Sequence, residues 1–158
     1  MSGADEATRT AFLPDEAATL AAGETLAKIV EPGLFIALSG NLGAGKTTLS
    51  RGILRGLGYG GKVKSPTYAL VELYNLPALD LYHFDFYRFN DPQEWAEAGF
   101  RDHFGTRNAC LVEWPERAGG LLPAPDLSIT LDLEGDGRRM RIVAETELGK
   151  RCLGRLPK

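Results

Sequence analysis

The chain has 158 residues, 44% of them hydrophobic and 25% charged, with a formal net charge of −3. These are the proportions of a globular protein of one-domain size, which argues against extensive disorder and against binding nucleic acid through overall charge. No apolar run approaches the length that spans a bilayer. We therefore predict one cytoplasmic domain over residues 1–158, with a basic tail at about 150–158 whose order stays open.

The first part of the chain alternates strand and helix signals. A short strand is predicted over residues 7–13 and a helix over residues 14–30. The apolar run at 34–38 is typical of a buried strand, and apolar residues at three- and four-residue spacing predict a second helix over 46–57. The inner face expected for the first helix consists of Leu20, Ala21, Ala27 and Val30.

A glycine-rich segment joins the strand at 34–38 to the helix at 46–57. From Gly40 to Thr47 it matches G-x-x-x-x-G-K-S/T, the pattern of a phosphate-binding loop. Glycine lets backbone N–H groups and the positive helix terminus face a triphosphate. Lys46 is then expected to reach the β- and γ-phosphates, and the Thr47 hydroxyl to ligate Mg²⁺. The structural alternative is a glycine-rich turn with an incidental lysine.

The second part of the chain adds further strands. Apolar runs predict strands at 69–74, 81–86 and 109–112, and Asp91-Pro92 predicts the start of a helix that ends at Gly99. Two alternating runs predict a hairpin, and they occupy residues 127–133 and 140–144. The predicted fold class is α/β, a P-loop NTPase-like three-layer sandwich with a mixed sheet.

Two acidic residues are expected at strand ends that face the loop. Mg²⁺ needs hard oxygen ligands, so a phosphate loop depends on nearby carboxylates. Asp85 shares a strand face with Leu81 and His83 by period-two counting. Glu113 directly follows an apolar strand, where α/β proteins expose ligand-binding side chains. The structural alternatives are an ion pair between Asp85 and Arg88 and a turn role for Glu113.

Weaker signals come from single residues. Thr67 lies where a switch segment touches a γ-phosphate, but Ser-Pro-Thr-Tyr equally forms a plain turn. His83 and His103 lack paired-ligand spacing, so we expect half-buried strand or surface positions. Cys110 is expected to pack in the core. No Asn-Lys-x-Asp element occurs in the sequence, which favours adenine over guanine.

Four segments, in order along the chain, form a more specific pattern. They read SGNLGAGKTT at 39–48, SPTY at 65–68, HFDFYR at 83–88 and EWPE at 113–116. Together they resemble the bacterial TsaE ATPase family of tRNA threonylcarbamoyladenosine biosynthesis. The departures are mild. The family commonly has aspartate where Asn41 stands and phenylalanine where Tyr68 stands, and Asn41 makes the loop less negative.

The resemblance implies a Mg²⁺-dependent ATPase, slow alone, that works with the TsaB–TsaD heterodimer and meets tRNA only through that assembly. Lys46, Asp85 and Glu113 would be catalytic. Asp85 would hold the metal with Thr47, and Glu113 would act on the metal's water or as base. Trp114 would report on or contact a partner. The implied ATP-binding residues are Asn41, Leu42, Gly43, Ala44, Gly45, Lys46, Thr47, Thr48 and Thr67.

Two other functions stay open. A small-molecule kinase would use the same loop and needs a lid with clustered arginines. Arg138, Arg139 and Arg141 are clustered, but the predicted hairpin makes them solvated strand positions. A nucleotide-gated binding module would hold ATP as a switch without hydrolysis. Arg88 is the nearest internal arginine for the role of a finger, which otherwise falls to a partner.

Overall fold

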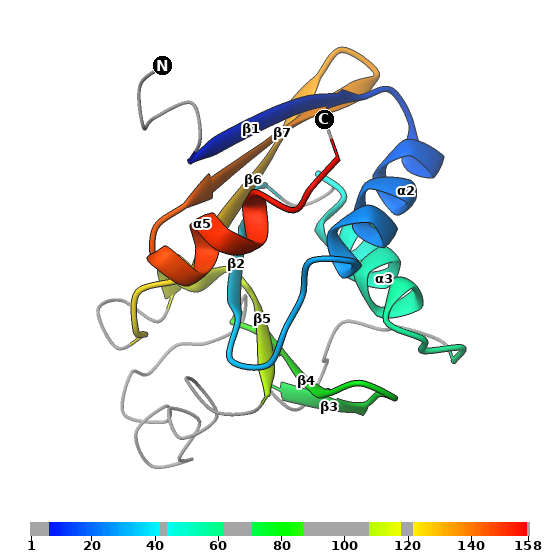
Figure 1. Cartoon of the computed structure of the whole chain (residues 1–158). Coiled ribbons are helices and arrows are strands. Elements are labelled where there is room, and N and C mark those ends of the chain that lie inside the picture. Colours follow the sequence, from blue (N-terminus) through cyan, green and yellow to red (C-terminus); the bar gives the residue numbers. More distant parts are fainter. Residues whose placement is uncertain (1–6, 42–43, 62–70, 87–107, 118–121, 158) are drawn as a thin grey trace.

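The computed structural model describes residues 7–41, 44–61, 71–86, 108–117 and 122–157. These residues form a seven-stranded sheet with helices packed against it (Figure 1). In spatial order the strands are β1 (Thr8–Leu13), β7 (Gly137–Ala144), β6 (Leu127–Glu134), β2 (Phe35–Ser39), β5 (Ala109–Glu113), β4 (Asp80–Asp85) and β3 (Val71–Asn75). The described helices are α2 (Glu16–Ala27), α3 (Lys46–Gly56) and α5 (Glu147–Leu153).

The sheet is mixed, as predicted. Strands β6, β2, β5 and β4 run parallel, β7 and β3 join them as antiparallel neighbours, and β1 pairs antiparallel with β7. The carboxyl ends of the parallel strands therefore meet at one edge of the sheet, where α/β folds bind ligands. The α/β class is confirmed. The helix predicted from Asp91 to Gly99 lies outside the described residues.

The two faces of the sheet carry separate apolar clusters. Alternate residues of a strand point to opposite faces, so on β5 Leu111 joins the larger cluster while Cys110 and Val112 join the smaller one. The larger cluster also contains buried residues of α2, α3 and α5, which therefore cover one face of the sheet. Burial raises the pKa of the Cys110 thiol to about 12, and the predicted core position of this residue is confirmed.

Helices α2 and α3 lie side by side because glycines form their contact (Figure 1). A Cβ added to Gly52 of α3 would lie 2.9 Å from the Cα of Gly23 in α2. The inner face expected for α2 is wrong in part. Ala27 is buried and ends the helix, but Ala21 is exposed and Val30 lies beyond the last turn.

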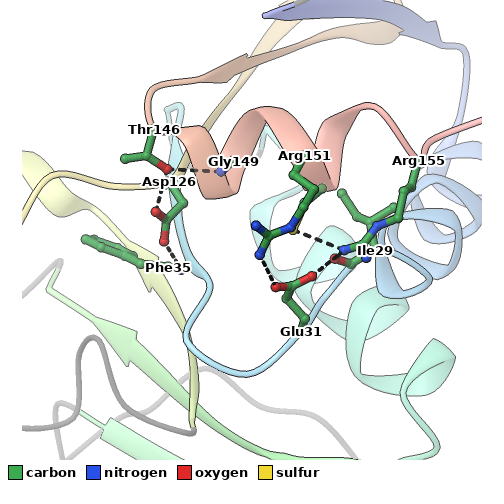
Figure 2. A network of polar contacts seen from close by, with 9 residues as sticks. Ile29, Glu31, Phe35, Asp126, Thr146, Gly149, Arg151 and Arg155 are labelled. Atoms are coloured by element: carbon green, nitrogen blue, oxygen red, sulfur yellow. Dashed lines mark hydrogen bonds and ion pairs between the residues drawn. The ribbon is translucent and has the colours of Figure 1, made fainter.

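Asp126 fastens α5 to the start of β2 (Figure 2). Its Oδ2 accepts a hydrogen bond from the backbone N–H of Phe35 at 2.8 Å, and its Oδ1 accepts one from the Thr146 hydroxyl at 2.6 Å. Thr146 is the N-cap of α5, and its Oγ1 in turn accepts from the N–H of Gly149 at 3.0 Å. One carboxylate therefore ties three chain segments together at the edge opposite the carboxyl ends of the parallel strands.

The basic tail, whose order the sequence left open, is helical from Lys150 to Leu153 as part of α5. Two of its arginines hold Glu31, which lies between α2 and β2 (Figure 2). Arg151 and Arg155 each place a guanidinium nitrogen on this carboxylate, at 2.8 and 2.6 Å. None of the helices in the described part of the chain has the length and apolar character needed to cross a membrane.

Candidate functional site

The phosphate-loop segment leaves the end of β2 and leads into α3. Gly40 has φ +147°, and a Cβ there would lie 2.5 Å from the carbonyl oxygen of Leu131 on β6. Gly45 has φ +100° and is the N-cap of α3 without a side-chain hydrogen bond to the helix. Both positions require glycine because side chains rarely adopt this backbone conformation. The N–H groups of the first turn of α3 therefore have no side-chain cap at Gly45, and uncapped N–H groups at a helix N-terminus favour the binding of anions.

Lys46, the first residue of α3, is buried, with 5% of its surface exposed. Its ammonium nitrogen donates to the carbonyl oxygen of Gly40 at 2.5 Å. Burial lowers the pKa of Lys46, while the charges of Glu113, Glu116 and Asp85 oppose this shift. No carboxylate of the described residues lies within ion-pairing distance of this ammonium. An anion bound in the loop would offset the cost of burying the charge.

The two predicted carboxylates come together at the edge that faces the loop. Asp85 ends β4 and Glu113 ends β5, and the parallel pairing sets them directly beside each other. On the other side, Glu113 pairs in register with Leu38 of β2, two residues before Gly40. The structure therefore places Glu113 on the strand next to β2 and Asp85 one strand further away, both at the carboxyl edge of the parallel strands.

Glu113 is buried, and its partner is His83. Oε2 of Glu113 lies 2.6 Å from Nε2 of His83, the distance of a short hydrogen bond in which the ring N–H donates to the carboxylate. The exposed fractions are 2% for Glu113 and 0% for His83. The expectation of a half-buried or surface histidine is therefore wrong. Period-two counting along β4 already set His83 on the face of Asp85, but the partner came from the unpredicted strand order.

Trp114 follows Glu113 with a left-handed backbone, φ 59°, which no other non-glycine residue in the described ranges has. The backbone N–H of Trp114 donates to the carbonyl oxygen of Leu38 at 3.3 Å, which extends the contact between β5 and β2. Its ring centroid lies 3.4 Å from Nζ of Lys46, a cation–π contact. Residues with a strained backbone cluster at functional sites. Here the residue with the left-handed backbone is Trp114, whose indole contacts Lys46.

The side chain of Arg138 reaches the loop, which the sequence analysis did not predict. The expectation of a solvated strand position is wrong for it, because its side chain lies against Gly45. A Cβ added to Gly45 would lie 3.3 Å from Cδ and from Cζ of Arg138. The signal was present in the alternation of β7, since Arg138 shares parity with the buried Met140 and Ile142. Arg139 and Arg141 have the opposite parity and are exposed, as predicted.

The remaining predicted residues divide between described and undescribed parts. Ala44 is buried, Thr47 and Thr48 are half-buried in the first turn of α3, and Asn41 is exposed. Within the described ranges, no group of three or more histidine, cysteine or acidic side chains forms a metal cluster. Mg²⁺ in nucleotide sites takes one or two carboxylates plus phosphates, so such a cluster is not required. The residues outside the described ranges are Leu42, Gly43, Thr67, Arg88 and His103.

Comparisons with known proteins agree on one family. The family model described as "Threonylcarbamoyl adenosine biosynthesis protein TsaE" matches residues 13–141. The chain is 45% identical to the tRNA threonylcarbamoyladenosine biosynthesis protein TsaE of Haemophilus influenzae, over 91% of this chain and 94% of that protein. It is 39% identical to the protein of the same name from Bacillus subtilis, over 80% of this chain and 77% of that protein. The crystal structure of B. subtilis YdiB matches with a TM-score of 0.79 and 29% identity, covering 94% of this chain and 93% of YdiB.

Proposed function

The chain belongs to the TsaE family of tRNA threonylcarbamoyladenosine biosynthesis, and from this premise we propose that it is a Mg²⁺-dependent ATPase acting on the TsaB–TsaD transferase assembly. The observation that carries the ATPase proposal is the buried Lys46 ammonium at the start of α3. It has a carbonyl and an indole ring as neighbours, and a triphosphate would supply the counter-charge.

The two carboxylates take different roles in this proposal. Asp85 is half-buried on the face of β4 that carries His83, and we assign it to Mg²⁺ together with the Thr47 hydroxyl. An ion held by these two residues would supply positive charge beside the phosphates and so help to neutralise the charge that develops on them. Glu113 is held by His83, so its second oxygen is available to orient the attacking water or accept its proton. The residue set fits a magnesium nucleotide because it combines hard oxygen ligands with a loop of backbone donors.

The partner assignment rests on family membership. ATP hydrolysis would reset the transferase assembly between rounds, with tRNA reached only through that assembly. A cytoplasmic location is part of the same proposal, and so is slow turnover by the isolated chain. Phosphoryl transfer depends on positioning and charge neutralisation, so a partner that orders the site would raise the rate.

Single-turnover hydrolysis of ATP, with and without TsaB–TsaD, tests the proposal. We expect the partners to raise the rate, and Lys46→Ala and Glu113→Ala each to lower it by a factor on the order of 10². Lys28→Ala and Glu147→Ala are matched controls, because both residues are exposed and the second lies on α5, at the edge of the sheet opposite the loop. Both controls should keep the rate of the parent.

Three results would point elsewhere. Phosphorylated product in a small-molecule screen would favour a kinase. Tight ATP binding without hydrolysis, even with TsaB–TsaD present, would favour a nucleotide-gated binding module. If the partners leave ATP consumption unchanged and both site variants match the parent, the enzymatic proposal is wrong.

A further inference from the structure

Arg138 differs from its two neighbouring arginines in where its side chain goes. It continues the inward row of β7 formed by Met140 and Ile142, on the face that the helices cover. Arg139 lies on the opposite face, where it pairs with Glu134 at 2.8 Å. Arg141 is exposed on that same opposite face. Of the three arginines, only Arg138 therefore lies on the face of the sheet that the helices cover.

The guanidinium of Arg138 meets the loop at the glycine that precedes Lys46. Its Cζ and one terminal nitrogen lie against the space that a Cβ of Gly45 would fill. Its Nε is buried and has no hydrogen-bond partner among the described residues. A buried N–H of a charged group without an acceptor is costly, and such groups in native structures are normally satisfied. An acceptor that arrives with a ligand would supply the missing partner.

The sheet order fixes the side from which Arg138 approaches. Strands β6 and β7 lie on one side of β2, whereas β5 and β4, with Glu113 and Asp85 at their ends, lie on the other. The metal and the γ-phosphate belong with those two carboxylates in the proposed function. Arg138 therefore reaches the loop from the side remote from the reacting phosphate.

We propose that Arg138 binds the inner phosphates of the nucleotide, the ones that ATP and ADP share, from the β6–β7 side of the loop. This inference rests on the proposed function and assigns one more residue to its site. Arginine suits the task because its planar guanidinium donates two parallel hydrogen bonds to phosphate oxygens. A contact made equally with substrate and product raises affinity and leaves the turnover number unchanged.

Calorimetric titration with MgATP, MgADP and magnesium tripolyphosphate, together with single-turnover rates at saturating ATP, tests this assignment. We expect Arg138→Ala to weaken all three ligands by a similar factor, about 10- to 100-fold, while the saturated rate stays near that of the parent. Arg138→Lys keeps the charge but loses the paired geometry, so its loss should be smaller. Arg141→Ala, on the other face of the same strand, should bind all three ligands like the parent.

Each other outcome overturns the assignment in its own way. Weaker ATP binding with unchanged ADP binding, or a lower saturated rate, would place Arg138 at the γ-phosphate. Unchanged tripolyphosphate binding would place it at the nucleoside. If Arg138→Ala does not fold, Arg138→Lys decides, and parent-like affinities there overturn the proposal. If the parent binds none of the three ligands, the proposed function itself fails before any variant is compared.

Discussion

The contact between His83 and Glu113 links stability to the proposed chemistry at the scale of single residues. A carboxylate with 2% exposure needs a donor, because burying a charge without a partner is costly. His83 supplies that donor through Nε2, and its own Nδ1 is buried without a partner among the described residues. The imidazole therefore acts on Glu113 alone within the described part of the site and fixes the direction of its second oxygen.

Replacing His83 by alanine should destabilise the fold by about 1–3 kcal/mol, because the buried carboxylate of Glu113 loses its hydrogen bond. Urea unfolding of the two proteins measures the difference. His83→Gln keeps a donor near the same place and should lose less. The double variant His83→Ala with Glu113→Ala should cost less than the sum of the two single variants. Additive losses would mean that the pair contributes no coupling energy.

Trp114 offers a direct readout of the loop. Its ring lies on the Lys46 ammonium, and a bound triphosphate would draw that ammonium to the phosphates. Titration with MgATP should therefore change the indole fluorescence, and Trp114→Phe should remove the response. The sequence contains one other tryptophan, Trp95, whose emission remains in that variant as a background. An equal response in Trp114→Phe would show that the signal comes from Trp95.

At the scale of elements, the packing of α2 on α3 depends on glycines. Alanine in a helix is normally more stable than glycine by about 0.5–1 kcal/mol. Gly52→Ala should nevertheless destabilise the protein, by about 1–3 kcal/mol, because the new Cβ would lie 2.9 Å from the Cα of Gly23. Thermal unfolding measures this effect. Gly60→Ala is the control, since a Cβ there meets nothing within 4 Å. A stabilised Gly52→Ala protein would show that the helices move apart freely.

The same glycines show where prediction from sequence stops. Periodicity and turn residues predicted the existence and approximate bounds of the described strands, and of α2 and α3. They were wrong in part for the inner face of α2, because Gly23, which lies against α3, has no side chain that an apolar pattern could include. The loop and the acids at the strand ends could also be predicted, because a short local sequence motif identifies each of them. His83 on Glu113 and Arg138 on Gly45 depend on strand order, a long-range property that local patterns do not contain.

On the scale of the whole molecule, the two edges of the parallel strands have different tasks. The carboxyl edge holds the loop, the acids and Arg138. The opposite edge is bound together by Asp126, which contacts β2 and the cap of α5 (Figure 2). Glu31 adds a second contact at this edge, because its carboxylate forms ion pairs with Arg151 and Arg155. Changes at this edge should therefore alter stability without altering the proposed nucleotide site.

The contribution of this opposite edge to stability can be measured through the pH dependence of the Glu31 ion pairs. Hydrogen bonds from Arg151 and Arg155 lower the pKa of Glu31 in the folded protein below its ordinary value of 4.5. The folded state thus favours the ionised carboxylate. The stabilisation is present above the pKa of the unfolded chain and is lost as pH falls through the lower folded value. Since the pairs lie near the surface, screening by water keeps the effect small.

Glu31→Gln should therefore lower the melting temperature by about 1–4 °C at pH 7, and the difference from the parent should vanish at strongly acid pH. Melting curves of both proteins across the acid range measure it. Glu147→Gln is the matched control, because its ion pair with Lys150 spans 3.6 Å and its side chain is 93% exposed, so the melting temperature should not move. A difference that persists for Glu31→Gln at acid pH would mean that the ion pairs with Arg151 and Arg155 are not its source. Affinity for MgATP should equal that of the parent in both variants, since Glu31 lies at the edge opposite the loop.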